Sequence, residues 1–156
     1  RDMSGKISAY DPSENIHKNG ILVESKVPAN ISFSTSSDAI ILASKIVRNL
    51  NYVGVMGIEF FITKEKKILV NEMAPRVHNS GHWTQTGCII SQFEQHIRAI
   101  TGTPIGDGRR HSNVLMKNIL GNQIFDINYE SEKSINIYGK DKVKNNRKMG
   151  HVNIIK

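Results

Sequence analysis

Only one cysteine, Cys88, occurs in the sequence, so the chain has no internal disulfide bond and no zinc site built from several cysteines. This scarcity favours a reducing compartment, and we expect a cytoplasmic protein in which Cys88 is a half-buried apolar side chain. No run of about 18 apolar residues is present, which excludes a membrane-spanning helix. The chain starts at Arg1 without a methionine or a charged-then-apolar leader. We therefore see no signal peptide and expect that Arg1 lies inside a larger protein.

Acidic residues are fewer than basic ones, 14 against 21, which gives a formal net charge of +7. Ten of the basic residues lie between Arg109 and Lys156. This excess favours an anionic partner, either a nucleic acid or a phosphorylated small molecule, although a solvated basic surface without a partner fits as well. Tyr138 is the only aromatic residue in the basic segment 138–150. The lack of interleaved aromatic residues argues against binding of single-stranded nucleic acid.

Short β-rich runs surround two segments of helical periodicity in a chain whose length fits one domain, or one domain with a small appendage. Strands are predicted at 6–10, 20–27, 53–63, 67–73, 112–119, 134–138 and 151–155, and helices at 37–51 and 91–101. This order indicates an α+β fold with antiparallel pairing rather than a series of βαβ units.

The predicted helices and turns carry recognisable start and stop signals. Ser37 can cap the first helix, because its hydroxyl can accept a bond from an unpaired backbone N–H. An apolar stripe that should pack on a sheet follows it: Ala39, Ile40, Ala43, Ile46, Val47 and Leu50. Gly102 ends the second helix, which carries Phe93, Ile97 and Ile100 on one face. A polar turn is predicted at 11–15, between the first two strands.

The runs 53–63 and 67–73 are separated only by Lys64-Glu65-Lys66 and therefore predict a β-hairpin. If the hairpin turns at Glu65-Lys66, the numbers of paired residues sum to 131. The predicted pairs are Phe61 with Val70, Phe60 with Asn71, and Glu59 with Glu72.

This register places two carboxylates directly opposite each other. Such side chains lie about 5 Å apart on one face of the sheet, where like charges repel. A divalent cation resolves the repulsion, and two carboxylates with phosphate oxygens suit magnesium. Glu59 and Glu72 are therefore predicted metal ligands. A register slip that separates them, or an exposed pair neutralised by Lys67 or Arg76, stays open as an alternative.

A polar loop follows the second strand of the hairpin. His78 and His82 have the spacing of a zinc-binding helix, but Asn79-Ser80-Gly81 disfavours a helix and no glutamate follows His78, so the zinc signal is weak. A loop whose histidines and asparagine bond to the backbone is the alternative. Arg76 can direct its guanidinium toward phosphate or carboxylate oxygens. Trp83 is expected to fill the core under this loop.

A second polar cluster consists of Tyr138-Gly139-Lys140 and Arg147-Lys148-Met149-Gly150. Two glycines beside several cations give a flexible backbone that can hold a phosphate group. A solvated basic hairpin without a ligand explains the same composition equally well.

These residues carry a family resemblance that covers essentially the whole chain. The run 71–83 is the most specific part, and further similar runs are 14–17, 27–29, 57–61, 91–96, 138–140 and 147–151. They closely resemble the N5-carboxyaminoimidazole ribonucleotide synthetases, ATP-grasp enzymes of purine biosynthesis. The resemblance implies a reaction in which ATP and bicarbonate give carboxyphosphate, which carboxylates the amine of 5-aminoimidazole ribonucleotide.

The resemblance also implies roles for individual residues. Glu59 and Glu72 match the magnesium ligands of the family, in line with the hairpin register. Asn71 and Glu72 match its ATP-site pair, and His17 resembles a nucleotide contact. ATP and Mg²⁺ are thus the implied cofactors.

Arg76 and His78 match positions beside the bicarbonate and the reacting amine. We hypothesise that Arg76 stabilises developing charge on carboxyphosphate while His78 orients the amine or the bicarbonate. Lys140 and Arg147 match positions that hold the ribonucleotide phosphate, and Lys148 is assigned to the same substrate-binding loop.

The family normally has an N-terminal nucleotide-fold domain and a first half of the ATP-grasp unit, which this sequence lacks. We expect residues 1–109 to be the C-terminal part of an ATP-grasp domain and 110–156 to be a small β subdomain with the basic loop. The chain alone should be inactive, and the intact enzyme should be a homodimer that binds neither nucleic acid nor membrane.

Two other functions remain as alternatives. The first is another ATP-grasp ligase, acting for example on formate with glycinamide ribonucleotide or on bicarbonate with biotin. The runs 78–83 and 147–151 argue against it. The second is a basic, non-enzymatic nucleic-acid-binding module.

Overall fold

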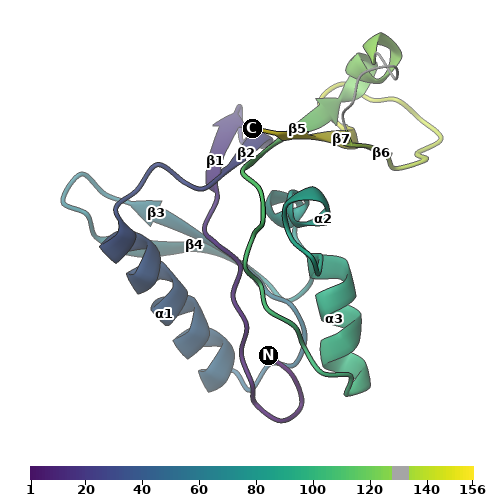
Figure 1. Cartoon of the computed structure of the whole chain (residues 1–156). Coiled ribbons are helices and arrows are strands. Elements are labelled where there is room, and N and C mark those ends of the chain that lie inside the picture. The colour runs from purple at the N-terminus through teal and green to yellow at the C-terminus, as the bar shows by residue number, and fades with distance from the viewer. Residues whose placement is uncertain (128–133) are drawn as a thin grey trace.

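The computed structural model describes residues 1–127 and 134–156 and contains two antiparallel sheets with packed helices (Figure 1). The strands are β1 (Glu14–Lys18), β2 (Ile21–Val27), β3 (Gly57–Ile62), β4 (Ile68–Ala74), β5 (Val114–Leu120), β6 (Ser134–Ile137) and β7 (Lys148–Ile155). The helices are α1 (Phe33–Asn49), α2 (Thr84–Gly87) and α3 (Gln92–Thr101), with 3₁₀ turns η1 (Asn79–Gly81) and η2 (Gly121–Asp126). The predicted α+β class with antiparallel pairing is confirmed.

The larger sheet has five strands in the order β1-β2-β5-β7-β6, and the smaller sheet is the β3–β4 hairpin. In Figure 1, α1 and α3 lie on either side of the irregular N-terminal segment, below the larger sheet. Strand β2 pairs with β5, with Val27 opposite Val114. Strands from both sides of the predicted 109–110 boundary thus share one sheet, and that boundary stays a prediction.

The first hairpin lies later in the chain than predicted. Residues 6–10 form no strand, and the first strand is β1, which pairs with β2 across Asn19-Gly20. Both turn residues have positive φ, 50° for Asn19 and 74° for Gly20. Two successive positive-φ residues match the right-handed twist of paired strands, which makes Asn-Gly a favoured hairpin turn. The predicted turn at 11–15 was therefore wrong.

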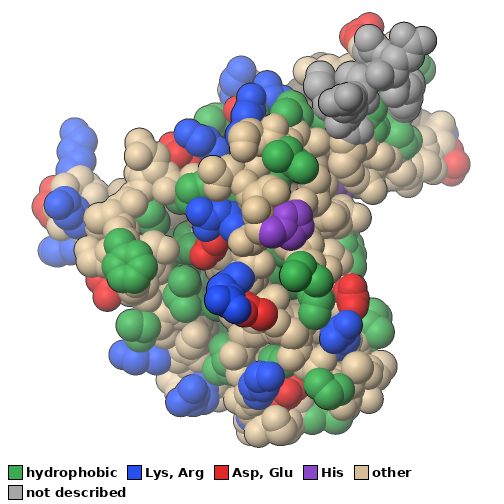
Figure 2. Space-filling model, viewed as in Figure 1, with side chains coloured by type: hydrophobic (Ala, Val, Ile, Leu, Met, Phe, Trp, Pro, Cys, Tyr) green, Lys and Arg blue, Asp and Glu red, His purple; other side chains and the backbone are tan. Residues whose placement is uncertain are grey.

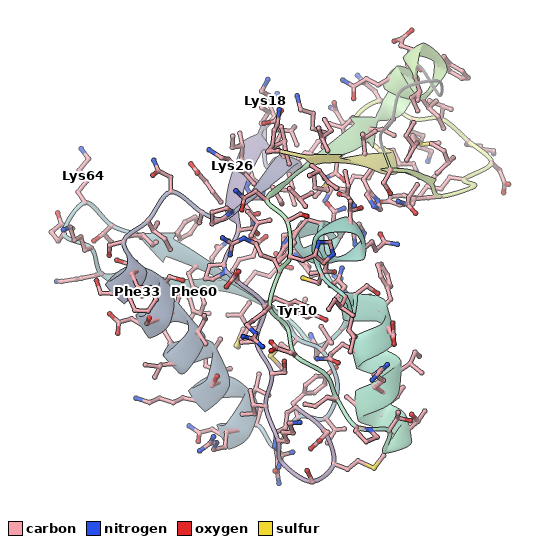
Figure 3. The ribbon with its side chains drawn as sticks, viewed as in Figure 1. Tyr10, Lys18, Lys26, Phe33, Phe60 and Lys64 are labelled. Carbon is pink, nitrogen blue, oxygen red and sulfur yellow. The ribbon has the colours of Figure 1, made fainter. Side chains whose placement is uncertain are left out.

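Helix α1 begins earlier than predicted because Ser32, not Ser37, is its N-cap. The Ser32 hydroxyl accepts a hydrogen bond from the Thr35 N–H at 3.1 Å, and Ser37 lies inside the helix. Ala39 and Val47 from the predicted stripe are buried. Phe33, at the start of the helix, is 88% exposed (Figure 3).

Helix α3 matches its predicted bounds, with Ser91 as N-cap and Gly102 in the left-handed conformation at its end. The face that carries Phe93, Ile97 and Ile100 is the exposed one. The buried face holds two glutamines, Gln92 and Gln95, with Ala99. Glutamine is tolerated there because its amide bonds to neighbouring backbone: Gln95 accepts from the Gly106 N–H at 3.0 Å and donates to its carbonyl at 2.9 Å.

The principal apolar core lies where β2 and β5 meet the segment 83–88. Its buried members are Leu22, Val27, Trp83, Cys88, Val114 and Met116. Trp83 is 2% exposed, so its predicted place in the core is confirmed. Cys88 is more deeply buried than predicted, and burial raises the pKa of its thiol to about 12. Tyr10 packs edge-on against Trp83 and donates to the Ile90 carbonyl at 2.9 Å (Figure 3).

None of the helices in the described part of the chain has the length and apolar character needed to span a bilayer. Lysine and arginine side chains are spread over the face shown in Figure 2 rather than gathered into one stripe.

The β1–β2 turn gives a direct test of the corrected hairpin. A Cβ at Gly20 would meet no atom within 4 Å, so Gly20→Val should act through its positive φ alone. We expect the free energy of unfolding in urea to fall by about 1–2 kcal/mol. Gly20→Asn is the matched control and should cost less, because asparagine adopts this conformation more readily. Equal stability of the valine variant and the wild type would contradict the assigned turn.

Candidate functional site

Glu59 on β3 lies directly opposite Glu72 on β4, as the hairpin periodicity predicted. The other two predicted pairs are wrong, since Phe60 pairs with Val70 and Phe61 with Leu69. The register shifts immediately after Glu59, where Asn71 is the extra residue of a β-bulge on β4. Bulges re-aim side chains and are common next to binding sites. Here the bulge shifts the pairing by one residue and so brings Glu72, rather than Asn71, opposite Glu59.

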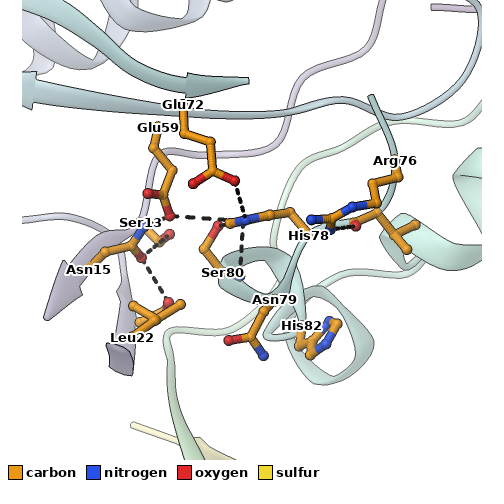
Figure 4. A network of polar contacts seen from close by, with 12 residues as sticks. Ser13, Asn15, Leu22, Glu59, Glu72, Arg76, His78, Asn79, Ser80 and His82 are labelled. Atoms are coloured by element: carbon orange, nitrogen blue, oxygen red, sulfur yellow. Dashed lines mark hydrogen bonds and ion pairs between the residues drawn. The ribbon is translucent and has the colours of Figure 1, made fainter. Parts of the chain in front are cut away.

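The two carboxylates have different surroundings (Figure 4). The Glu59 side chain is 11% exposed, and its Oε1 accepts a hydrogen bond from Asn15 Nδ2 at 3.2 Å. The Glu72 side chain is 53% exposed. No lysine or arginine within residues 1–127 and 134–156 forms an ion pair with either, so Lys67 and Arg76 do not neutralise them. Two carboxylates without a lysine or arginine ion pair in the described part of the chain are a donor set that suits magnesium, with phosphate oxygens and water as the remaining ligands.

His78 lies between the two carboxylates. Its Nδ1 is 3.9 Å from Glu59 Oε1, and its Nε2 is 3.7 Å from Glu72 Oε1. The Ser80 N–H also approaches Nδ1, at 3.4 Å, and the Ser80 hydroxyl lies 2.8 Å from it. Nδ1 therefore acts as the acceptor, which leaves the proton on Nε2, facing Glu72. Burial lowers the pKa of His78, although Glu59 and Glu72 oppose this shift.

The backbone at His78 is held by a side chain that the sequence analysis did not single out. Gln92, 3% exposed at the start of α3, accepts from the His78 N–H at 2.9 Å and donates to the His78 carbonyl at 2.7 Å. On the other side, a Cβ on Gly57 would lie only 2.5 Å from His78 Cβ. The missing side chain at Gly57 thus lets the loop pack directly against β3.

A neutral histidine pair lies behind this loop. His82 and His151 have ring centroids 4.7 Å apart, and His82 also stacks on Phe93 at 5.3 Å. Burial and the neighbouring His151 lower the pKa of His82 to about 3, and burial lowers that of His151 to about 4. His151 Nε2 donates to Gln85 Oε1 at 3.1 Å, so its Nδ1 accepts from the Tyr138 hydroxyl at 2.8 Å.

The weak zinc signal of His78 and His82 has no support in the geometry. His82 Nδ1 is occupied by Gln92 Nε2 at 2.8 Å. Across the described ranges, no group of three or more His, Cys, Asp or Glu side chains is arranged to hold a metal ion. A cation at Glu59 and Glu72 would therefore need oxygen ligands from a substrate.

Lys148 of the C-terminal basic loop interacts with the carboxylate pair, and Lys140 is bound to its backbone. Burial lowers the pKa of Lys148, while the negative charges of Glu59 and Glu72 act on it in the opposite direction. Lys140 Nζ donates to the Lys148 carbonyl at 2.6 Å and lies 5.5 Å from the centroid of the Tyr138 ring. Lys148 thus interacts with Glu59, which lies 89 residues earlier in the chain, and Lys140 is bound to the Lys148 backbone.

The two arginines predicted as site residues, Arg76 and Arg147, donate hydrogen bonds to backbone carbonyl groups of nearby residues. Arg76 is exposed, and its guanidinium donates to the Val77 carbonyl at 2.9 Å. Its positive charge nevertheless contributes to the lowered pKa of both His78 and Lys148, which places it beside them. Arg147 donates to the Lys142 carbonyl of its own loop at 3.0 Å.

His17 and Asn71 line one cleft together with Glu59 and His78. This cleft has a volume of about 480 Å³ and is bounded by α1, β3 and the N-terminal segment. Ala39, Ile40, Ala43 and Val47 form its apolar wall on α1. The cleft therefore combines an apolar wall with a few polar groups, as ligand sites commonly do.

Comparison with protein families agrees with this geometry. The ATP-grasp domain model matches residues 1–93, more than half of the chain. The chain belongs to the ATP-grasp family. A second family, the phosphoribosylaminoimidazole carboxylase C-terminal domain, matches residues 114–156 of this ATP-grasp chain.

Individual relatives and solved structures indicate which ATP-grasp enzymes the chain is similar to. The N5-carboxyaminoimidazole ribonucleotide synthase of Brucella melitensis biotype 1 is 49% identical over 159 residues, which cover 100% of this chain and 44% of the relative. The crystal structure of an ADP complex of an N5-carboxyaminoimidazole ribonucleotide synthetase has a TM-score of 0.95 and 44% identity, covering 100% of this chain and 42% of that one. The structure of the Aspergillus clavatus enzyme with ADP and 5-aminoimidazole ribonucleotide has a TM-score of 0.90 and 32% identity, covering 96% of this chain and 43% of that one. The ATP-grasp chain thus spans less than half the length of these relatives.

The histidine pair predicts acid sensitivity of the ATP-grasp chain. The unfolded state takes up protons at both rings near pH 6.5, whereas the folded state does so only near their lowered pKa values of about 3 and 4. The free energy of unfolding should therefore fall as the pH decreases from 6.5 to 4.

Ring-proton NMR titration checks this assignment directly. Neither His82 nor His151 should titrate above pH 5. A midpoint near pH 6.5 for either buried ring would contradict the prediction.

Proposed function

We propose that the full-length protein containing this chain carboxylates 5-aminoimidazole ribonucleotide to N5-carboxyaminoimidazole ribonucleotide in de novo purine biosynthesis, using ATP and bicarbonate through carboxyphosphate. The decisive observation is the placement of Glu59 and Glu72 opposite each other, with His78 and Lys148 beside them. The two family matches and the similarity to named synthases over the whole chain support this choice among ATP-grasp reactions.

In this proposal Glu59 and Glu72 hold Mg²⁺ against the ATP phosphates. The bound ion would neutralise phosphate charge during phosphoryl transfer. Asn71 and His17 contact the nucleotide, consistent with their place along the cleft. The apolar α1 wall of that cleft suits the base rather than the phosphates.

His78 acts as a neutral hydrogen-bonding group because burial disfavours its charged form. Its fixed Nε2–H orients bicarbonate or the reacting amine, and Gln92 keeps the loop in place. Arg76, exposed beside His78, supplies positive charge for the developing carboxyphosphate. The guanidinium would exchange its bond to the Val77 carbonyl for one to the substrate.

Lys140, Lys148 and Arg147 bind the ribonucleotide phosphate in this proposal. Lys148 is favoured as a direct contact, because its ammonium is partly desolvated and close to the carboxylate pair. Arg147 uses one of its N–H donors on the Lys142 carbonyl and keeps others for the phosphate. A lysine held near the site in advance loses less side-chain entropy when the phosphate arrives.

The matched relatives are more than twice as long as this chain. We therefore propose that activity requires the remaining part of the synthetase and that the chain alone is inactive. We also propose that the full-length protein is a cytoplasmic homodimer. Within this chain, we propose that 1–109 belongs to the ATP-grasp domain and 110–156 forms a small β subdomain. Phosphate release measured with 5-aminoimidazole ribonucleotide, glycinamide ribonucleotide and biotin distinguishes this reaction from other ATP-grasp ligations. A nucleic-acid-binding module would instead show affinity that falls steeply with salt.

The carboxylate pair can be tested without changing its shape. In the full-length protein, Glu59→Gln and Glu72→Gln should each abolish phosphate release from Mg²⁺-ATP in the presence of bicarbonate and 5-aminoimidazole ribonucleotide, because a neutral amide binds magnesium poorly. Glu65→Gln, at the tip of the same hairpin, is the matched control and should retain wild-type rates. Normal activity of either first variant would refute the assigned metal site.

The lysine assignment predicts a different kinetic effect. Lys148→Met should raise the KM for 5-aminoimidazole ribonucleotide by about 10–100-fold, because it removes a charged contact to phosphate. The KM for ATP should change little. Lys142→Met, on the exposed part of the same loop, is the control with an expected KM close to that of the wild type. A rise confined to the KM for ATP would contradict this assignment and would indicate that Lys148 binds the nucleotide instead.

A further inference from the structure

Asn15 connects the two sheets at the proposed metal site. It lies on β1 of the five-stranded sheet, where its cross-strand partner is Ser25 on β2. Its side-chain Nδ2 donates to Glu59 Oε1 at 3.2 Å, on the separate β3–β4 hairpin (Figure 4). The Ser25 hydroxyl donates to Asn15 Oδ1 at 2.7 Å, and the Ser13 hydroxyl does so at 3.3 Å.

The direction of this hydrogen-bond chain follows from chemistry. An ionised carboxylate can only accept, so the amide must turn its NH₂ group toward Glu59. The amide oxygen then faces Ser25, whose hydroxyl must donate. Ser25 is 0% exposed, so no water competes for this bond. A flipped Asn15 would set its oxygen against the carboxylate and is therefore disfavoured.

The bond to Asn15 restrains a carboxylate that would otherwise turn away. Glu59 and Glu72 repel each other in the absence of a cation, and a free glutamate side chain would relieve this by rotation. Asn15 engages Oε1, while no hydrogen-bond donor to Oε2 is found within the described ranges. Glu72 is half exposed and has no comparable amide partner there. The hairpin thus carries one fixed and one adjustable carboxylate.

We propose that Asn15 is a positioning residue that holds Glu59 in the orientation in which it shares a divalent cation with Glu72, with Ser25 fixing the Asn15 amide. This inference rests on the proposed function, because it requires a cation at the carboxylate pair. Ligating carboxylates in metal sites are commonly restrained by such outer hydrogen bonds. A purely structural Asn15 would instead affect folding stability without affecting metal affinity.

Binding of Mn²⁺ in the presence of saturating ADP tests the proposal in the full-length protein, with the dissociation constant measured by water-proton relaxation. Asn15→Ala should weaken Mn²⁺ binding by about 10-fold, as expected for loss of an outer-shell partner. Ser25→Ala should give a smaller loss in the same direction. Ser13→Ala removes the longer bond to the same oxygen and is the matched control, with an expected change below about twofold.

A double-mutant comparison separates positioning from general structural damage. If Asn15 acts through Glu59, Asn15→Ala should have no further effect on Mn²⁺ affinity in the Glu59→Gln background. In the metal-free protein, Glu59→Gln should also shift the side-chain amide resonances of Asn15. Unfolding in urea identifies variants that lose their fold, and Ser25→Ala carries the test if Asn15→Ala does not fold.

The outcomes distinguish this inference from the proposed function. Unchanged Mn²⁺ affinity in folded Asn15→Ala, or an equal loss in both backgrounds, would overturn the positioning role. Unchanged affinity in Glu59→Gln and Glu72→Gln would overturn the metal site itself and the proposed function with it. Weaker but still measurable Mn²⁺ binding in both glutamate variants, together with a 10-fold loss confined to Asn15→Ala in the wild-type background, supports both.

Discussion

Electrostatic repulsion between Glu59 and Glu72 is the constraint around which this site is built. Antiparallel pairing of β3 and β4 sets the two carboxylates opposite each other, and no lysine or arginine among the described residues is ion-paired with them. The fold therefore stores an unfavourable charge contact that a stability-driven sequence would avoid. Asn15 moderates it with one hydrogen bond to Glu59. Only a cation would remove it fully.

The other half of the site depends on close packing of a loop that has little regular structure. His78 can approach β3 because Gly57 has no side chain, and Gln92 then binds both backbone groups of His78. Gly81 makes room for the same glutamine, since a Cβ there would lie 2.7 Å from its Oε1. The buried amide thus replaces the hydrogen bonds that a strand or helix would otherwise provide.

Much of the site could be predicted from local pattern. The opposition of Glu59 and Glu72 follows from two β-rich runs around a short turn, and it holds because the bulge at Asn71 shifts the pairing by one residue on the turn side of the pair. The two remaining predicted pairs lie between the bulge and the turn, where paired numbers sum to 130 instead of 131, so they were wrong. Asn19-Gly20 is a typical hairpin turn and could have been predicted from the sequence. The run at 6–10 led instead to a first strand predicted too early in the chain.

Other features could not be read locally. Asn15 meets Glu59 across 44 positions, and Gln92 meets His78 across 14. These contacts arise only when separate elements pack, so no spacing rule announces them. The partial burial of Lys148 could not be predicted locally either, because it depends on β7 lying within the five-stranded sheet. Hydrophobic periodicity likewise gave no sign that α3 would bury its glutamines.

The division of the molecule into two sheets has a mechanical consequence. His17 on β1 and Lys148 on β7 belong to one continuous sheet, so their separation is set by a network of backbone hydrogen bonds. Both carboxylates sit on the other sheet, which is joined to the first near Glu59 by one side-chain amide. A small swing of the hairpin would change the reach of the carboxylates while the spacing between β1 and β7 stayed constant. The larger sheet thus fixes the positions of His17 and Lys148, and the position of the hairpin sets how close the carboxylates come to them.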